Sequence, residues 1–156
     1  QSAFGRVLVA ATERGVCTIS IGEDDLALNS ALEGEFPRAT IKRDDAALEL
    51  FLAAVLAHVR DRTTLAALPL DIIGTRFQQQ VWDTLRTIPA GERRTYGEIA
   101  RAMGNPGAAR AAGSACAANP LAVVIPCHRA VPADGTPGGY RWGSERKAAL
   151  LAAEER

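Results

Sequence analysis

The residues best suited to chemistry are three neighbours, Cys127, His128 and Arg129, which follow the apolar pair Ile125-Pro126. The thiolate is the nucleophilic form of cysteine, and a free thiol with a pKa of about 8.5 is only a few per cent ionised near neutrality. A neighbouring imidazole and guanidinium would lower that pKa, so this group predicts an activated nucleophile. A buried cysteine beside a structural histidine also fits these residues, as does the dyad of a cysteine hydrolase.

Geometry limits how Cys127 and His128 can cooperate. Adjacent residues on a strand or helix point in different directions, so the two side chains do not easily face each other. A bridging water would instead carry the thiol proton to His128, with a carboxylate behind the imidazole to fix its tautomer. Glu154, near the end of the chain, is the candidate for that carboxylate.

Cysteine and histidine usage excludes two common classes of small protein. Cys17, Cys116 and Cys127 are odd in number and widely spaced, and the only histidines are His58 and His128. This pattern supports neither a disulfide framework nor a zinc site, and nothing in the sequence indicates a cofactor. We expect Cys17 and Cys116 to behave as small apolar residues.

Length and composition indicate a folded, soluble chain. Its 156 residues, 47% of them hydrophobic, are enough for one compact domain or two small lobes. No apolar run reaches the about 18 to 20 residues that span a bilayer, and the sequence given does not open with a basic-then-apolar leader and a small-residue cleavage site. We therefore expect a cytoplasmic protein with no membrane partner, and a chain that begins at Gln1 is compatible with a fragment.

Charge differs between the two halves of the chain. Residues 1–74 hold 7 Lys and Arg against 11 Asp and Glu, whereas residues 75–156 hold 11 against 7. The second half is therefore the better candidate for a surface that faces phosphates.

The first half predicts a small lobe of mixed structure. Short apolar runs at 6–11 and 16–21 flank a turn and indicate a β-hairpin. Acidic residues before an apolar pattern predict a helix over 24–36, and leucines and valines spaced by three and four predict an amphipathic helix over 45–62 that packs on the hairpin. Residues 68–73 predict one more strand, and the change of pattern after Gly74 marks the lobe boundary.

The second half predicts a mainly helical lobe. Thr75 with Gln78, and Thr95 with Glu98, are capping boxes that open helices ending at Arg86 and before Gly104. A turn at 105–107 and an alanine-rich helix over 108–118 complete the layout of a helix-turn-helix unit, although simple core packing fits the same pattern. We further expect a buried strand over 123–125, a loop over 126–143 and a terminal helix over 144–155 with Ser144 as its N-cap.

Several motifs in this half resemble the O6-alkylguanine-DNA alkyltransferases, also called methylated-DNA–protein-cysteine methyltransferases. They are Asn119-Pro120, Ile125-Pro126-Cys127-His128-Arg129 and Gly139-Tyr140-Arg141-Trp142-Gly143. The Tyr-Arg-Trp-Gly form, with the segments 77–82 and 114–119, is most similar to the C-terminal domain of the bacterial Ada adaptive-response proteins. The resemblance runs from the first hairpin to Glu154 and implies an α/β (α+β) fold. Residues 1–74 would form a ribonuclease H-like lobe with a small antiparallel sheet, and residues 75–156 a DNA-binding and alkyl-acceptor lobe with a helix-turn-helix.

The resemblance also implies a role for each catalytic position. Cys127 would accept the alkyl group in a single irreversible event, His128 would take its proton through a water, and Glu154 would orient His128. The Asn119 side chain would hold the turn at Cys127 by hydrogen bonds to its backbone. The Tyr96 hydroxyl would donate to N3 of the guanine, which gains negative charge as its bond to the alkyl carbon breaks.

The same resemblance implies a substrate pocket. The backbone N–H of Arg141 would approach O6, and the carbonyls of Cys127 and Ala130 would accept from the exocyclic amine. Lys147 would lie near the pocket, and the bulk of Trp142 beside Tyr140 would narrow it.

DNA is the expected partner, in the form of a duplex that contains O6-alkylguanine. The target atom lies inside the duplex, so the nucleotide must be flipped out, and Arg110 would fill the gap. Small residues would let this helix sit close to the minor groove and bind with little sequence preference, namely Ala108, Ala109, Ala111, Ala112 and Gly113.

We expect a monomer. If the chain is part of a longer protein, one arrangement would place an Ada-type regulatory domain upstream of it. Two other classes stay open on the residues alone: a module that binds alkylguanine without repairing it, against which the presence of Cys127 argues, and a cysteine hydrolase.

Overall fold

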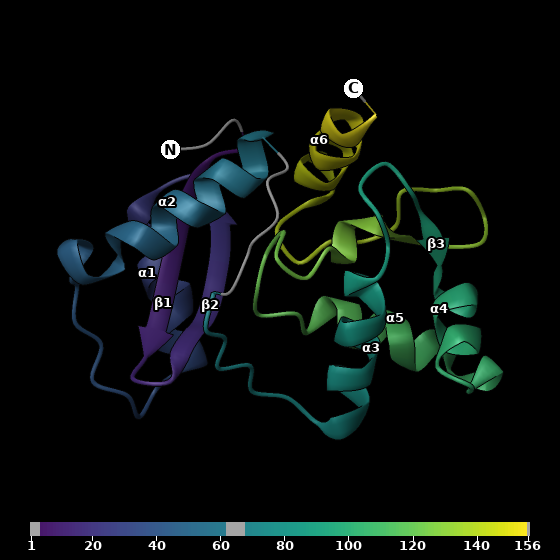
Figure 1. Ribbon diagram of the computed structural model, residues 1–156, viewed down its shortest axis with the longest axis horizontal. Helices are drawn as coiled ribbons and strands as arrows, with labels where there is room; N and C mark the ends of the chain where they lie inside the picture. Colours follow the sequence, from purple (N-terminus) through teal and green to yellow (C-terminus); the bar gives the residue numbers. More distant parts are fainter. Residues whose placement is uncertain (1–3, 62–67, 156) are drawn as a thin grey trace. The chain divides into compact units, whose positions relative to one another are not determined.

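The structure, a computed structural model, describes residues 4–61 and 68–155. The chain divides into two compact units, Gln1–Ile72 and Ile73–Arg156. The first unit contains a hairpin and two helices, and the second is mainly helical (Figure 1). A mixed fold of helices and small sheets, as expected from the sequence, is confirmed.

The first unit is built on the predicted hairpin. Strands β1 (Arg6–Thr12) and β2 (Gly15–Gly22) pair antiparallel, with an irregularity between Ala10 and Ala11. Helix α1 (Asp25–Glu35) begins where the Asp24 side chain accepts the Ala27 N–H, and it packs on the hairpin. Helix α2 (Asp45–Asp61) packs on β1, which confirms the amphipathic helix up to residue 61; Arg62 lies outside the described residues.

The strand expected at 68–73 is wrong. Only Leu70 forms a bridge, with Val16, supported by hydrogen bonds from Val16 N–H to the Pro69 carbonyl (2.8 Å) and from Asp71 N–H to the Val16 carbonyl (2.9 Å). Proline has no N–H to donate and cannot continue a ladder of hydrogen bonds, so the pairing stays local.

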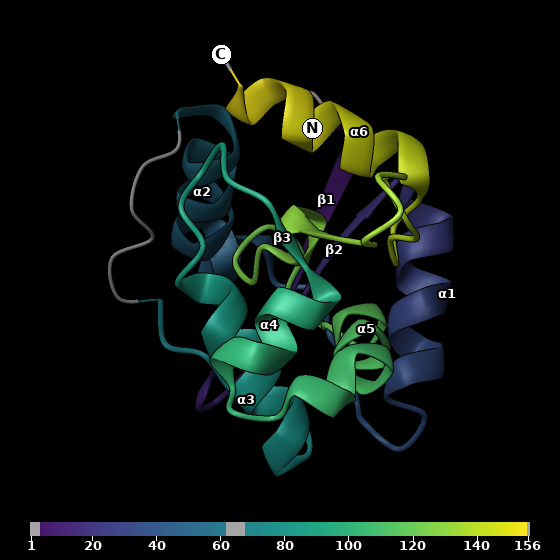
Figure 2. The same cartoon turned by 90° about the vertical axis from the view of Figure 1, so that its right-hand side faces the viewer.

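In the second unit, the helices begin and end close to where local signals place them. They are α3 (Arg76–Arg86), α4 (Tyr96–Ala102), the 3₁₀ turn η1 (Pro106–Ala108), α5 (Ala109–Ala117) and α6 (Ser144–Glu154). Both predicted capping boxes are present, at Thr75 with Gln78 and at Thr95 with Glu98. Helix α5 packs against α3 and α4 (Figure 2), and the buried Trp82 indole donates to the Ala115 carbonyl at 2.9 Å.

A second, parallel pair of strands joins two distant segments of this unit. Strand β3 (Arg94–Thr95) pairs with β4 (Ala130–Val131), which directly follows the 3₁₀ turn η2 (Cys127–Arg129). Strands of two residues are too short to produce a periodic sequence pattern, so this pairing was not predicted. It fixes the start of α4, and with it Tyr96, relative to the segment that carries Cys127.

The buried strand expected over 123–125 is also wrong, although Val123 and Ile125 are buried. The chain instead makes tight turns there, and Val123 adopts φ 60°, a left-handed conformation that β-branched residues rarely take. The Asn119 side chain accepts the Leu121 N–H (2.8 Å) and donates to the Ile125 carbonyl (2.9 Å). It thereby satisfies backbone groups that a neighbouring strand would otherwise satisfy. Cys127 consequently opens a 3₁₀ turn and does not lie at the end of a strand.

The start of α6 differs from expectation by one residue. Gly143 is the N-cap, with φ 102°, and no side chain caps the helix there. Glycine adopts this left-handed conformation without a steric penalty, which is why it ends the preceding loop and Ser144 falls inside the helix.

Candidate active site

Cys127 lies at the first position of η2 and is 3% exposed. Its Sγ accepts a hydrogen bond from Asn119 Nδ2 at 3.0 Å, and the same amide group donates to the Ile125 carbonyl. Asn119 is fully buried, so its three hydrogen bonds fix both the turn and the sulfur. The backbone contacts of the carboxamide thus lie in the segment before Cys127, not in the Cys127-His128 turn itself, and a direct contact with the thiol is added.

The electrostatics of the thiol differ from the expectation. Burial raises the pKa of Cys127 to about 11, and the opposing effects of the Asn119 hydrogen bond and of the Lys147 and Arg141 charges are smaller. Arg129, expected to lower this pKa, points its guanidinium at Glu154 instead. The thiol is therefore protonated at rest, and a base must remove its proton before the sulfur can attack.

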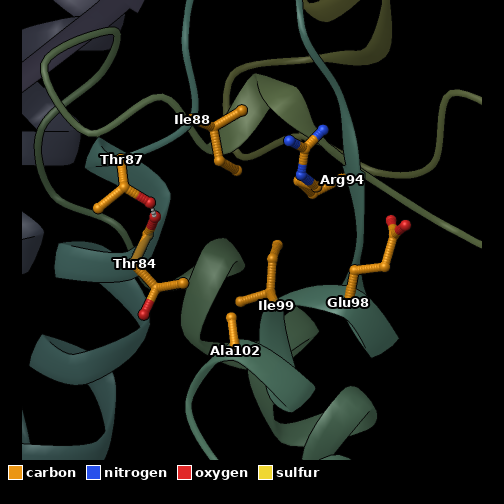
Figure 3. Close-up of a pocket in the computed structure, with 7 residues that line it drawn as sticks. All are labelled: Thr84, Thr87, Ile88, Arg94, Glu98, Ile99 and Ala102. Carbon is orange, nitrogen blue, oxygen red and sulfur yellow. Dashed lines mark hydrogen bonds between the residues drawn. The ribbon is translucent and has the colours of Figure 1, made fainter.

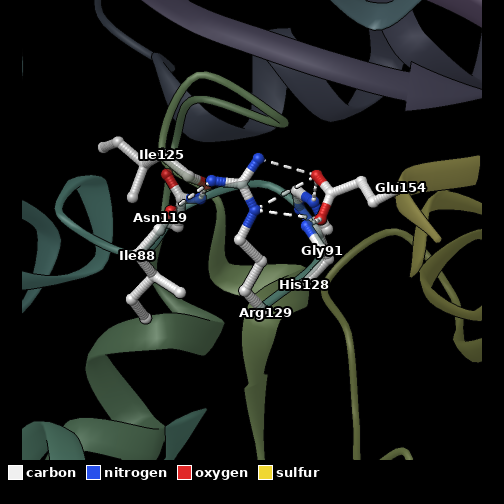
Figure 4. A network of polar contacts seen from close by, with 7 residues as sticks. All are labelled: Ile88, Gly91, Asn119, Ile125, His128, Arg129 and Glu154. Atoms are coloured by element: carbon white, nitrogen blue, oxygen red, sulfur yellow. Dashed lines mark hydrogen bonds and ion pairs between the residues drawn. The ribbon is translucent and has the colours of Figure 1, made fainter. Parts of the chain in front are cut away.

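Such a base lies next in the chain. His128 is 1% exposed, and its Nε2 lies 2.9 Å from Glu154 Oε1 (Figure 4). Burial lowers the pKa of His128 and outweighs the opposing influence of Glu154, so the imidazole is neutral near pH 7. A carboxylate only accepts hydrogen bonds, which places the proton on Nε2 and leaves Nδ1 as an acceptor. Nδ1 is buried and has no hydrogen-bond partner among the described residues.

Glu154 is the centre of a larger network. Besides His128, it accepts from Arg129 Nε (3.0 and 3.1 Å) and Nη2 (2.7 Å), and from the Gly91 N–H (3.2 Å). Burial by itself raises the pKa of Glu154, but the hydrogen bonds from His128 and Arg129 outweigh it and hold the pKa at about 2. Glu154 is thus a carboxylate at physiological pH. The clamp by Arg129 and the Gly91 contact were not foreseen, because these residues are far from Glu154 in the sequence.

Lys147 holds together two segments that follow Cys127 in the chain. This fully buried side chain donates from Nζ to the carbonyls of Ala130 (2.7 Å) and Gly139 (3.2 Å), and burial lowers its pKa. The Ala130 carbonyl, expected to accept from a guanine amine, therefore already binds one donor, and its second lone pair stays available. Lys147 joins the segment after Cys127 to the glycine-rich loop that follows.

Three aromatic or cationic side chains of that loop lie together. The Tyr140 ring meets His128 (centroids 6.5 Å apart) and Trp142 (5.2 Å) edge to face. The buried Tyr140 hydroxyl has no hydrogen-bond partner in the described part of the chain. Arg141 Nη1 donates to the Asn119 carbonyl at 2.9 Å, and its guanidinium lies 5.7 Å from the centre of the Trp142 ring. Side chains expected at one pocket are thus close to the Cys127 network.

Tyr96, the first residue of α4, lies close to one glycine of α5 and to one glycine of this loop. A Cβ at Gly113 of α5 would lie 3.8 Å from the Tyr96 ring, and a Cβ at Gly138 would lie 3.6 Å from its hydroxyl. Burial raises the pKa of Tyr96, so the hydroxyl keeps its proton and can donate a hydrogen bond.

Helix α5 presents only part of its small-residue face to solvent. Arg110 and Ala111 are exposed, Ala108, Ala109 and Gly113 are half-buried, and Ala112 is fully buried in the core. Ala112 therefore packs inside the unit and does not line an outer surface. The exposed Arg110 is the side chain of this group best placed to reach another molecule.

A small cavity of about 180 Å³ lies elsewhere in this unit, between the end of α3 and α4 (Figure 3). It is lined by Thr84, Thr87, Ile88, Arg94, Glu98, Ile99 and Ala102, and Cys127 is not among these residues. Within residues 4–61 and 68–155, no three His, Cys, Asp or Glu side chains are placed to hold a metal ion. No helix in the same residues combines the length and apolarity needed to cross a membrane.

The fold and the site together define a class: a mixed helix-and-sheet protein with a buried cysteine thiol beside a histidine, glutamate and arginine network. A family model described as "6-O-methylguanine DNA methyltransferase, DNA binding domain" matches residues 76–156, more than half of the chain. The chain belongs to this family, which confirms the resemblance seen in its motifs.

Individual relatives agree with this assignment. The chain is 53% identical over 151 residues to the "Bifunctional transcriptional activator/DNA repair enzyme Ada" of Escherichia coli, with 97% of this chain and 43% of that protein covered. It is 32% identical to the inducible "Methylated-DNA--protein-cysteine methyltransferase" of Bacillus subtilis, with 95% and 83% covered. A crystal structure of Mycobacterium tuberculosis OGT in complex with DNA superposes with a TM-score of 0.83 at 37% identity, covering 99% of this chain and 89% of that one. The chain thus spans less than half the length of the Ada protein it matches.

Proposed function

We propose that this protein repairs DNA by transferring an alkyl group from O6 of guanine to Cys127. The observation that carries the proposal is a buried thiol, hydrogen-bonded by Asn119, directly next to a neutral histidine whose Nδ1 is free to accept a proton. Membership in the methyltransferase family supports it. The product is a thioether without a good leaving group, so each molecule acts once.

The reaction balances without any cofactor. A new bond forms between Cys127 Sγ and the alkyl carbon as the bond from that carbon to O6 breaks, and the guanine takes the electron pair. The thiol proton passes to His128 Nδ1 through a water, because neighbouring residues do not face each other directly. Glu154 stabilises the imidazolium through Nε2. His128 then gives its extra proton to the guanine anion, and the network returns to its resting state.

We propose that the substrate pocket is formed by the residues that the family resemblance implies. Tyr96 donates its hydroxyl to N3 of the guanine, and the Arg141 backbone N–H donates to O6, where negative charge develops. The carbonyls of Cys127 and Ala130 accept from the exocyclic amine, which selects guanine over adenine. Tyr140 and Trp142 bound the space beside Cys127, and Lys147 holds the loop that carries them.

DNA is the proposed partner, and α4, η1 and α5 the helix-turn-helix that contacts it. Small residues at Ala108, Ala109, Ala111 and Gly113 allow α5 to approach the minor groove closely, and Arg110 takes the place of the flipped nucleotide. The M. tuberculosis relative of known structure was crystallised with DNA, which supports this partner. We propose a monomer that acts in the cytoplasm, with a ribonuclease H-like lobe over 1–74 and the DNA-binding and acceptor lobe over 75–156.

Intact-mass spectrometry tests the proposal directly. The protein is mixed with duplex DNA that carries O6-methylguanine, and one added methyl group is expected on each molecule. Cys127→Ala must abolish the increase, while Cys17→Ala and Cys116→Ala keep it, because the Asn119 carboxamide holds the Cys127 sulfur and neither of the other two. An unchanged mass, with tight binding to the same DNA, would indicate a module that recognises the lesion without repairing it. More than one product molecule per protein would indicate a hydrolase.

A second function rests on the likeness to Ada. Because the match covers 43% of a protein named as both transcriptional activator and repair enzyme, we propose that this chain is the acceptor part of a longer Ada-type regulator. Promoter binding by the full-length gene product, measured before and after alkylation, tests this. The regulatory role is excluded if the full-length product binds the promoter equally well before and after alkylation, whether or not it has a further domain.

A further inference from the structure

Arg129 is a buried arginine to which the proposed reaction assigns no task. Its side chain is 11% exposed and makes four hydrogen bonds, three to the Glu154 carboxylate and one to the Ile88 carbonyl, none longer than 3.1 Å. Nε and Nη2 bind the Glu154 carboxylate, and Nη1 donates to the Ile88 carbonyl at 2.5 Å. The guanidinium therefore joins the end of α6 to the segment after α3 (Figure 4).

Glu154 needs such a partner for two physical reasons. It is the last residue of α6, where the helix dipole is negative and a carboxylate is unfavourable. Its side chain is also only 11% exposed, so little water solvates the charge. With His128 as its sole partner, the carboxylate would be neutralised by an imidazolium.

The charges around His128 come from three segments. Glu154 and Lys147 act on it from α6, Arg129 from its own turn η2, and the Tyr140 ring from the loop between η2 and α6. The segment after α3, the helix that also packs on η2, contributes only uncharged groups to the network, the Ile88 carbonyl and the Gly91 N–H. Two cations thus oppose one carboxylate, and Arg129 is the cation bound directly to that carboxylate.

We propose that Arg129 is a positioning residue for alkyl transfer, which clamps Glu154 so that the carboxylate orients the His128 Nε2–H without drawing a second proton onto the imidazole. The inference rests on the proposed function, in which His128 must be neutral to accept the thiol proton. Burial and Arg129 both lower the pKa of His128, in agreement with this assignment. Arg129→Met retains the length of the side chain and removes the charge and the clamp.

Removal of the Arg129 clamp changes the pKa of His128 in a definite direction. In the methionine variant, Glu154 keeps His128 and the Gly91 N–H as partners but loses its cation, so the pKa of His128 rises. A larger share of the molecules then carries an imidazolium at neutral pH and cannot accept a proton. The acid limb of the transfer rate moves to higher pH by the same amount, and the rate on that limb falls about tenfold per unit.

The experiment compares wild type with Arg129→Met, Arg129→Lys and the control Arg93→Met. Arg93 pairs with Glu155, the exposed neighbour of Glu154, so its loss removes an ion pair at the same helix end without touching His128. Single-turnover transfer from a single-stranded oligonucleotide with one O6-methylguanine is measured between pH 5 and 9. The ring nitrogens of His128 are titrated by NMR in a His58→Gln background, which leaves one histidine in the chain.

We expect the acid limb and the His128 titration to shift upward together in Arg129→Met, to shift far less in Arg129→Lys, and to stay in place in Arg93→Met. A purely structural Arg129 predicts a smaller reactive fraction with an unshifted limb and an unshifted titration, and that result overturns the proposal. If Arg129→Met does not fold, Arg129→Gln takes its place, and an unshifted acid limb with an unshifted His128 titration in that variant also overturns the proposal. If wild type transfers no methyl group, the proposed function fails, whereas the NMR titration still decides the role of the clamp.

Discussion

Replacement of Asn119 by alanine is the perturbation with the most clearly defined structural effect. The side chain is fully buried and forms hydrogen bonds to three groups: the Leu121 N–H, the Ile125 carbonyl and Cys127 Sγ. Alanine leaves these groups buried without their partner, in a turn that also holds Val123 at a left-handed φ. The variant therefore loses stability and sulfur positioning at the same time.

The magnitude follows from the two backbone groups. A buried donor or acceptor that loses its partner costs about 1 to 3 kcal/mol, so the Leu121 N–H and the Ile125 carbonyl together cost about 2 to 6 kcal/mol. Small domains are stable by only about 5 to 15 kcal/mol, so the change is large on that scale. Urea denaturation followed by circular dichroism measures the free energy of unfolding, and the fluorescence of the buried Trp82 reports the same transition from the second unit.

Asn105→Ala is the matched control, because Asn105 is exposed and its side chain does not cap the turn η1. The control is expected to stay within about 0.5 kcal/mol of wild type, as most surface substitutions do. A loss below about 1 kcal/mol in Asn119→Ala would refute the reasoning, because the turn would then keep its shape without the carboxamide.

Three further predictions follow from the same geometry. Arg110→Ala is expected to slow methyl transfer from duplex DNA at least tenfold and to leave transfer from a single strand nearly unchanged, since only the duplex requires extrusion; equal losses on both would remove Arg110 from that role. Glu154 has a pKa of about 2 in the folded protein, below that of a free carboxyl, so its contribution to stability is present above about pH 4.5 and lost as the pH falls toward 2. Acid denaturation of Glu154→Gln should therefore be flatter in this range than that of wild type, and parallel curves contradict the assignment. Lys147→Met leaves the Ala130 and Gly139 carbonyls without their donor and is expected to weaken substrate binding more than Lys147→Arg, measured as the concentration of oligonucleotide at half-maximal rate.

Local features of the sequence were enough for most of the helices. Capping boxes at Thr75 and Thr95 gave the starts of α3 and α4 correctly, because a capping box involves residues only three apart. The hairpin followed from two short apolar runs on either side of a turn that ends in glycine. Each of these signals is complete within one turn or one hairpin, so tertiary contacts did not change the outcome.

The errors lie where distant groups satisfy the backbone. The apolar residues near Val123 have the composition of a strand, yet the Asn119 carboxamide binds the backbone groups that a strand would pair. At Pro69 the missing N–H ended the pairing after one bridge. Pairing partners are a tertiary property, so composition alone could not decide between strand and turn at either place.

The sequence by itself determined which residues are available for chemistry, since the order of Cys127, His128 and Arg129 and the motifs around them carry the family resemblance. The tertiary structure decided what each of them does. Burial, which depends on the whole unit, raises the pKa of Cys127 to about 11, and the position of Glu154 turns Arg129 away from the thiol. Desolvation and ion pairing depend on three-dimensional distance, and for that reason the expected thiol-activating arginine proved to be the partner of a carboxylate 25 residues further along the chain.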